Sequence, residues 1–144
     1  MKTDGLQLVI PYSNDQGLFT FPTTIMCTSD QGLQISDIKT LFDTGANITC
    51  ISQSVVEVLS PKLYSKETKF LAYNQLMPHQ YCRLNIVFDT ETTRQILYDV
   101  ECLVSPRPYI ELLLGMDIIC LGDFRILHSK NQLFQTFAMP PYHL

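Results

Sequence analysis

The sequence predicts an all-β fold, a barrel with one or two short helices. Three observations support this: short apolar runs recur along the whole chain, turn residues bound most of them, and only two brief segments suit a helix. Closely spaced short strands with little helix are typical of barrels and sandwiches. The 144 residues contain no repeat or linker, so we expect a single domain over residues 1–144, with its core at about 18–128 and its termini at an interface between subunits.

The predicted strands are apolar runs, alternating or continuous, that end at turn residues. They cover residues 6–10, 18–28, 33–42, 48–51, 69–73, 81–88, 95–104, 110–114, 124–127 and 132–137. The first run is closed by Pro11, which suits an edge or terminal strand. The imperfect period of the third predicts a bulge between Ser36 and Thr40. Residues 29–32 and 129–131 are expected to turn two hairpins.

Two segments are predicted to be short helices. The first follows Ser52 or Ser54, either of which can cap its start, and it ends before Pro61. The second covers residues 116–121, and Gly122 can cap its end.

Composition and charge exclude several classes of protein. The chain is 46% hydrophobic and 17% charged, as a globular domain is, and its net charge is −4. The basic residues are scattered, which argues against a nucleic-acid-binding protein, and no apolar run is long enough to span a membrane. Five widely spaced cysteines without a Cys-x-x-Cys pair indicate free thiols in a reducing compartment rather than a zinc site. Without a signal peptide, the chain is expected in the cytoplasm.

One stretch, residues 41–52, has the character of a functional site. Leu41 and Phe42 end an apolar run, Asp43 follows, Gly45 permits a sharp turn, and the apolar run resumes at Ile48. This order places the Asp43 carboxylate at a tight, largely buried corner. A buried carboxylate is costly unless it is hydrogen-bonded or its pKa is shifted, so a chemical role is expected.

The Asp-Thr-Gly-Ala motif inside this apolar frame resembles that of the single-domain, retroviral-type aspartic proteases (retropepsins). A second part of the family pattern, an apolar-apolar-Gly strand followed by a short helix, matches residues 112–119. The resemblance implies an aspartic endopeptidase on a retropepsin-like acid protease barrel. Asp43 is then the catalytic residue, and Thr44, Gly45 and Ala46 support the active-site turn.

The resemblance also implies a two-fold homodimer, because peptide hydrolysis needs two carboxylates sharing one proton and the chain has one such motif. Thr44 would bond across the two-fold axis, the Gly45 amide would face the carboxylate, and Ala46 would keep the floor of the site small. The substrate would be a peptide or protein, and no cofactor or metal is expected.

The chain departs from the family pattern at three places. Residues 74–80 lie where the family carries its flap, the hairpin that closes over bound peptide, but no glycine occurs between Gly45 and Gly115. Asn47 and Met116 replace residues that are often Asp and Arg in viral relatives. These departures leave open an alternative, a catalytically silent peptide-binding or dimerisation module on the same fold. Asp117 has two readings as well, as part of the second motif or only as a helix-stabilising acid.

Overall fold

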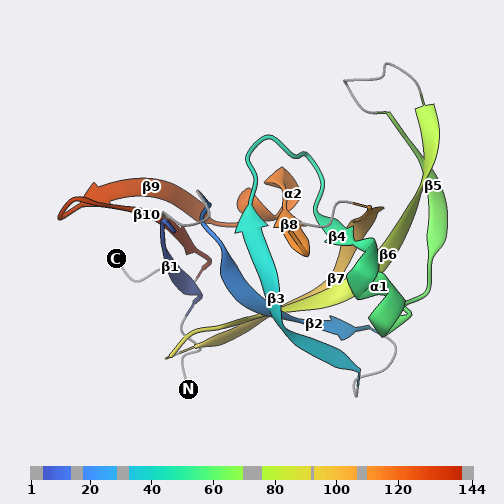
Figure 1. Cartoon of the computed structure of the whole chain (residues 1–144), viewed down its shortest axis with the longest axis horizontal. Helices are drawn as coiled ribbons and strands as arrows, with labels where there is room; N and C mark the ends of the chain where they lie inside the picture. Colours follow the sequence, from blue (N-terminus) through green and yellow to red (C-terminus); the bar gives the residue numbers. More distant parts are fainter. Residues whose placement is uncertain are drawn as a thin grey trace.

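The computed structural model describes residues 5–13, 18–28, 33–69, 76–91, 93–106 and 110–140. Its elements are, in order, β1 (Gln7–Pro11), β2 (Phe21–Cys27), β3 (Gln34–Phe42), β4 (Cys50–Ser52), α1 (Gln53–Leu59), β5 (Tyr64–Lys69), β6 (Leu76–Asp89), β7 (Arg94–Ser105), β8 (Leu112–Leu114), α2 (Met116–Ile119), β9 (Asp123–Ser129) and β10 (Gln132–Ala138). The chain is therefore mostly β-structure, as the sequence predicts (Figure 1).

Six strands form a closed barrel in the order β2-β3-β8-β4-β7-β6, and the pairing of β2 with β6 closes it. The hairpin predicted from residues 18–42 is present as the antiparallel pair β2–β3. Its bulge falls at Ser36 and Asp37, within the predicted interval, and Asp37 has a positive φ of 57°. The turn expected at residues 29–32 lies outside the described residues.

Strand β8 lies between β3 and β4, and this placement builds the functional end of the barrel. β3 and β8 run parallel, whereas β4 and β8 run antiparallel. The chain must therefore leave β3, pass the end of β8 and return along β4. The segment that makes this passage is the loop of residues 43–49, which stands at the top of Figure 1 beside α2. Both sequence motifs thus meet at one end of the barrel.

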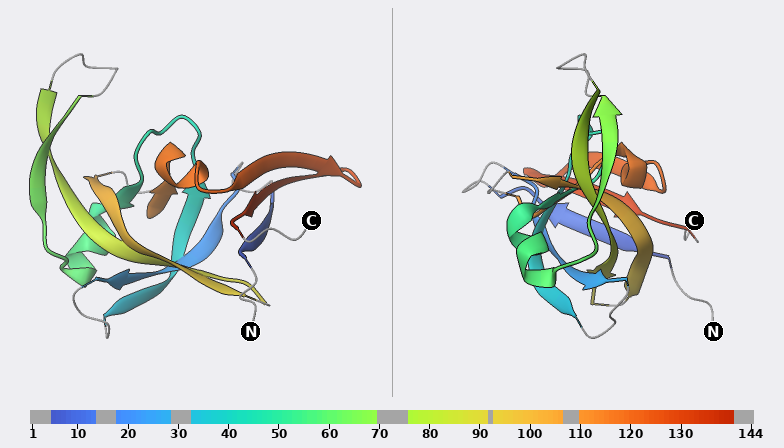
Figure 2. Two further views of the ribbon diagram at one scale, coloured as in Figure 1. Left: turned by 180° about the vertical axis from the view of Figure 1, so that it is seen from behind. Right: turned by 90° about the vertical axis from the view of Figure 1, so that its right-hand side faces the viewer.

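A separate antiparallel sheet joins the two ends of the described chain in the order β1-β10-β9. β9 and β10 form the predicted last hairpin, which extends away from the barrel (Figure 2). Lys130 and Asn131 both have positive φ and make its turn. The outer edges of β1 and β9 have no partner strand in the described part of the chain.

An aromatic cluster under Asp43 holds the small sheet against the barrel. The Phe42 ring lies 5.3 Å from that of Phe21, 5.5 Å from Phe124 and 4.8 Å from Phe137, measured between centroids. Phe42 is the residue before Asp43, so the same packing that joins the two sheets fixes the start of the 43–49 loop. Such pairs stabilise beyond the area that they bury.

Some predicted boundaries differ in the structure. Strand β5, Tyr64–Lys69, was not predicted before Lys69, because it is an exposed edge strand whose polar residues hide its period. Residues 70–73 of the strand expected at 69–73 lie outside the described residues. Of the two caps left open for α1, the structure has Ser52, whose side chain accepts a hydrogen bond from the Val55 amide. α2 ends at Ile119 with Cys120 as its cap. Gly122 is needed for another reason: a Cβ there would collide with the Ala138 carbonyl oxygen.

None of the five cysteines, all of which the structure describes, forms a disulfide, and Cys82 and Cys102 are fully buried and directly opposite each other on β6 and β7. Burial raises the pKa of Cys82 to about 11, which makes the thiol unreactive. In the part of the chain that the structure describes, no helix has the length and apolar character needed to cross a membrane.

Candidate active site

The Asp43 turn is held by the backbone at both of its ends. The Asp43 amide donates to the Leu114 carbonyl oxygen at 2.9 Å, and the Ala46 amide donates to the Asp43 carbonyl oxygen at 3.2 Å. The Ala46 carbonyl oxygen in turn accepts from the Met116 amide at 2.7 Å. The turn is therefore bonded to the strand before Gly115 and to the helix after it.

One oxygen of the Asp43 carboxylate is fixed within the turn. The Gly45 amide donates to Asp43 Oδ1 at 2.8 Å, which is the contact expected from the motif. A Cβ at position 45 would lie only 3.2 Å from this oxygen, so a larger residue would crowd the carboxylate. Among the described residues, no donor is bonded to Asp43 Oδ2.

The prediction that Asp43 is largely buried is wrong for the single chain. Asp43 and Ala46 are half-buried, whereas Thr44 and Gly45 are exposed. The turn faces outward because it projects beyond the strands that carry it (Figure 1), and none of the described residues buries Thr44 or Gly45. A second molecule packed against this exposed tip would bury Asp43 to the degree that the sequence suggests.

Asp117 does more than stabilise the start of a helix. Its carboxylate accepts from the Thr49 amide at 3.1 Å and from Thr49 Oγ1 at 2.8 Å. Thr49 is fully buried, and its Oγ1 accepts from the Gly115 amide at 3.2 Å. The second motif is thereby bonded to the far end of the 43–49 loop. The role of Thr49 was not predicted from the sequence. The available signal was weak: a Thr directly before strand β4 and an acid two residues after Gly115.

Gly115 is required by the close approach of the two motifs. A Cβ there would lie 2.7 Å from the Ile48 carbonyl carbon and 2.8 Å from the Ala46 and Ile48 carbonyl oxygens. These are backbone atoms of the 43–49 loop, so they can move only if the loop moves. Asn47, where viral relatives often have Asp, lies in the same loop and is exposed.

The histidines of the described residues do not form a cluster. His79 lies on β6 and His128 on β9, which belong to different sheets. No group of three or more His, Cys, Asp or Glu among the described residues could hold a metal ion. The glycine-free connection at residues 74–80 falls partly outside the described residues, so its departure from the family pattern remains a sequence observation.

Comparisons with known proteins agree with this architecture. The crystal structure of a retropepsin-like aspartic protease from Rickettsia conorii superimposes with a TM-score of 0.61 at 19% sequence identity, covering 96% of each chain. The barrel is therefore retropepsin-like. The search of curated protein sequences gives no match. The family description "Aspartyl protease" matches residues 28–118, a segment that contains the Asp43 turn, Gly115 and Asp117. On this match, over more than half of its length, the chain belongs to the aspartyl protease family.

Proposed function

We propose that the protein is an aspartic endopeptidase that works as a homodimer, with Asp43 of each chain forming the catalytic pair. The observation that carries the proposal is the Asp43 turn itself. It fixes one carboxylate oxygen with the Gly45 amide and presents the rest of the carboxylate at an exposed tip. The domain would span residues 1–144, with Thr44 and Ala46 supporting the turn.

The chemistry follows from two carboxylates that share one proton, because like charges held close together do not both ionise. The ionised Asp43 takes a proton from water as the water oxygen bonds to the peptide carbonyl carbon. The protonated Asp43 of the second chain donates to the carbonyl oxygen. The first Asp43 then gives its proton to the peptide nitrogen while the second takes a proton from a hydroxyl of the tetrahedral intermediate, and the C–N bond breaks to release a carboxylic acid and an amine. Both carboxylates thereby regain their starting states.

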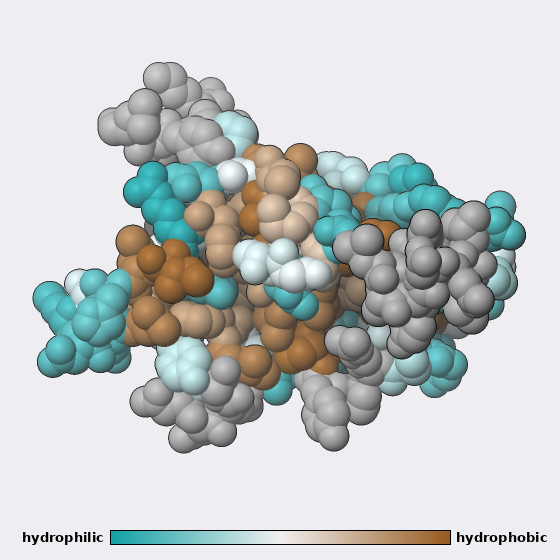
Figure 3. All heavy atoms as spheres, turned by 90° about the horizontal axis from the view of Figure 1, so that it is seen from above, coloured by the Kyte–Doolittle hydropathy of each residue, from teal (hydrophilic) through white to brown (hydrophobic). Residues whose placement is uncertain are grey.

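The surface around the turn supports a second copy of the chain as the missing half. Figure 3 looks down on the face that carries the loop and α2, and apolar side chains occupy its middle and extend toward the β9–β10 hairpin. Ile126 and Leu127 on β9 are 59% and 45% exposed, and Leu133 on β10 is 36% exposed. Large apolar areas that face water on a monomer indicate an interaction surface.

The dimer proposal revises which residues of the last hairpin lie at the interface. The termini are expected at the interface, but Phe137 of β10 is fully buried in its own chain and packs on Phe42. In the N-terminal run, Leu8 and Ile10 are likewise buried, whereas Val9 is 66% exposed. The candidates are thus the exposed apolar residues of β9 and β10, together with Val9.

The test is cleavage of a mixed peptide pool by the purified protein, with and without a statine inhibitor, which mimics the transition state. Asp43→Asn should lower kcat about a thousandfold or more while leaving the fold and the dimer intact, since the change is nearly isosteric. Asp37→Asn changes an exposed acid on β3, the strand that leads to Asp43, and this matched control should cleave normally. Equal turnover by Asp43→Asn and wild type would refute the mechanism, and statine binding without cleavage would identify a silent peptide-binding module.

A further inference from the structure

The β5–β6 hairpin is joined to the barrel along only part of its length. Residues 81–89 of β6 pair with β7, whereas residues 76–80 pair only with β5 among the described strands. Along β6 toward the tip of the hairpin, Tyr81 is the last residue that pairs with both β5, at Tyr64, and β7, at Leu103. Beyond this point the hairpin rises on the same side of the barrel as the 43–49 loop (Figures 1 and 2). Tyr81 therefore marks the root of a projecting arm.

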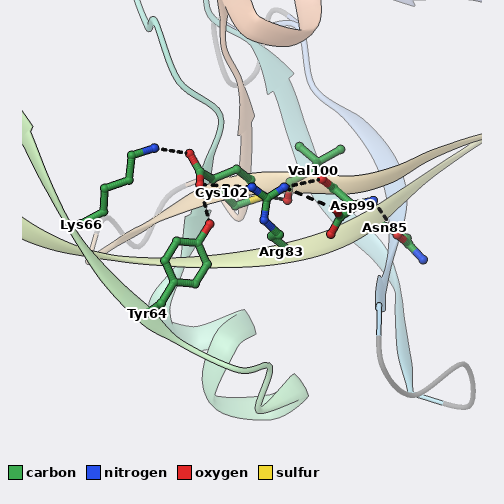
Figure 4. A network of polar contacts seen from close by, with 8 residues as sticks. Tyr64, Lys66, Arg83, Asn85, Asp99, Val100 and Cys102 are labelled. Atoms are coloured by element: carbon green, nitrogen blue, oxygen red, sulfur yellow. Dashed lines mark hydrogen bonds and ion pairs between the residues drawn. The ribbon is translucent and has the colours of Figure 1, made fainter.

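A single carboxylate connects the three strands at this root. Glu101 on β7 accepts a hydrogen bond from the Tyr64 hydroxyl at 2.5 Å and from Lys66 Nζ at 2.7 Å, both on β5. Arg83, its partner in register on β6, places Nη2 3.6 Å from the same carboxylate. Figure 4 shows Tyr64, Lys66 and Arg83 converging from their strands. Both oxygens of Glu101 are engaged.

The aromatic contacts below the carboxylate restrict the arm further. Tyr64 stacks on Tyr81 with 6.0 Å between ring centroids, and Lys66 Nζ lies 5.1 Å from the centroid of Tyr81. Tyr81 is fully buried. β5 pairs with no described strand except β6, so its angle to β7 is set by side chains. Tyr64 and Lys66 can reach both Tyr81 and Glu101 only over a narrow range of that angle.

Arg83 is itself held from the other side, at a bulge in β7. Its Nη1 donates to the Asp99 carbonyl oxygen at 3.2 Å and lies 3.4 Å from Asp99 Oδ2. Asp99 has a positive φ of 56°, and its amide donates to Asn85 Oδ1 at 2.8 Å. The guanidinium is thereby oriented before it meets Glu101.

We infer that Glu101 is a positioning residue for peptide cleavage, holding the β5–β6 arm at the angle at which it meets a peptide bound at Asp43. The effect on cleavage rests on the proposed function, but the mechanical role does not. Glu101 acts through Tyr64 and Lys66 and does not contact the substrate itself.

The charges around Glu101 keep this arrangement intact in mild acid. Hydrogen bonds from Lys66 and then Tyr64 lower the pKa of Glu101, with Arg83 adding to the effect. The other charged or titratable groups at the root are Asp99, on the far side of Arg83, and His79, the partner of Lys66 in register. Because the folded-state pKa is lowered, the stabilisation is complete above the pKa of the unfolded chain and is lost only as pH falls through the lowered value.

The first test is kinetic. Glu101→Gln and Lys66→Met should raise KM about fivefold with kcat nearly unchanged. Both variants remove contacts that hold the arm against the bound peptide, and these contacts are the same in the ground state and in the transition state. Lys66→Arg keeps the cation and should restore a KM close to that of wild type. Asp89→Asn is the control, since it removes an exposed ion pair with Arg94 at the opposite end of the same β6–β7 ladder.

The pH dependence of KM adds a readout that lost packing alone does not produce. In Lys66→Met the pKa of Glu101 moves back toward its ordinary value of about 4.3. The KM of this variant should therefore begin to rise at a higher pH than that of wild type as the solution is acidified. Superimposable KM profiles for the two proteins contradict the inference.

Amide hydrogen exchange of residues 64–69 and 76–80 decides the mechanical role without any activity. Protection there should fall in Glu101→Gln and stay unchanged in Asp89→Asn. Tyr64→Phe, which keeps the ring stack and loses only the hydroxyl, replaces Glu101→Gln if that variant does not fold. A folded variant with wild-type exchange and wild-type KM overturns the inference. If wild type cleaves no peptide but exchange falls as expected, the proposed function fails and the positioning of the arm stands.

Discussion

Thr49 shows how one buried side chain connects the two sequence motifs. Its hydroxyl donates to Asp117 and accepts from the Gly115 amide, so it joins the 43–49 loop to α2. Asp43, Gly45 and Gly115 could be predicted from sequence because each needs a specific residue type for local chemistry or space. Thr49 could not, because a Thr beside a strand is common and its partners lie 66 and 68 residues away.

Replacing Thr49 by Val should lower the free energy of unfolding by about 2 kcal/mol, because a buried amide and a carboxylate each lose a partner. Activity should fall as well, since the loop is no longer tied to α2. Denaturant unfolding and the peptide assay measure the two effects. Thr23→Val is the control: it removes a buried hydroxyl contact with Thr40 in the barrel wall, at 2.8 Å, and should cost stability without a matching loss of kcat. A fully active, fully stable Thr49→Val would contradict this role.

At the scale of elements, the approximate ranges of most strands and the second motif could be predicted, whereas the position of β5 could not. Buried strands such as β8 can be recognised in the sequence as continuous apolar runs. β5 is an edge strand with exposed Ser65, Lys66 and Glu67, and it is held by Glu101 of β7, which only the folded chain brings near. Tertiary contacts here override a weak local pattern.

The β9–β10 hairpin is the element that should hold two chains together. Deleting residues from 132 onward is a poor test, because β10 is the central strand of its sheet and carries the buried Phe137. The double substitution Ile126→Asp and Leu127→Asp instead places charge on two exposed positions. It should weaken dimerisation and activity together, as seen by sedimentation at several concentrations beside the peptide assay.

The control for the hairpin is Val58→Asp on α1, an apolar residue that is 70% exposed away from that hairpin. It should leave the dimer and the activity unchanged. A hairpin variant that stays dimeric and active would show that the two chains meet elsewhere.

At the scale of the whole molecule, the shared proton sets the response to pH. Cleavage should be fastest in mild acid and should decline as pH rises, because the pair of Asp43 carboxylates then loses the proton that one of them must donate. A pH–rate profile of kcat/KM for the wild-type dimer measures this. A rate that still climbs through neutral pH would indicate a different catalytic group.

The central claim is that one active site needs Asp43 from two chains, and mixing two kinds of chain tests it most directly. Wild type and Asp43→Asn are equilibrated at a one-to-one ratio, with total concentration fixed where dimers exchange subunits, and peptide cleavage is measured. If mixed dimers are inactive, random pairing leaves about a quarter of the activity of the same total concentration of wild type. A mixture that retains half of the activity would show that each chain cleaves on its own, and would contradict the account.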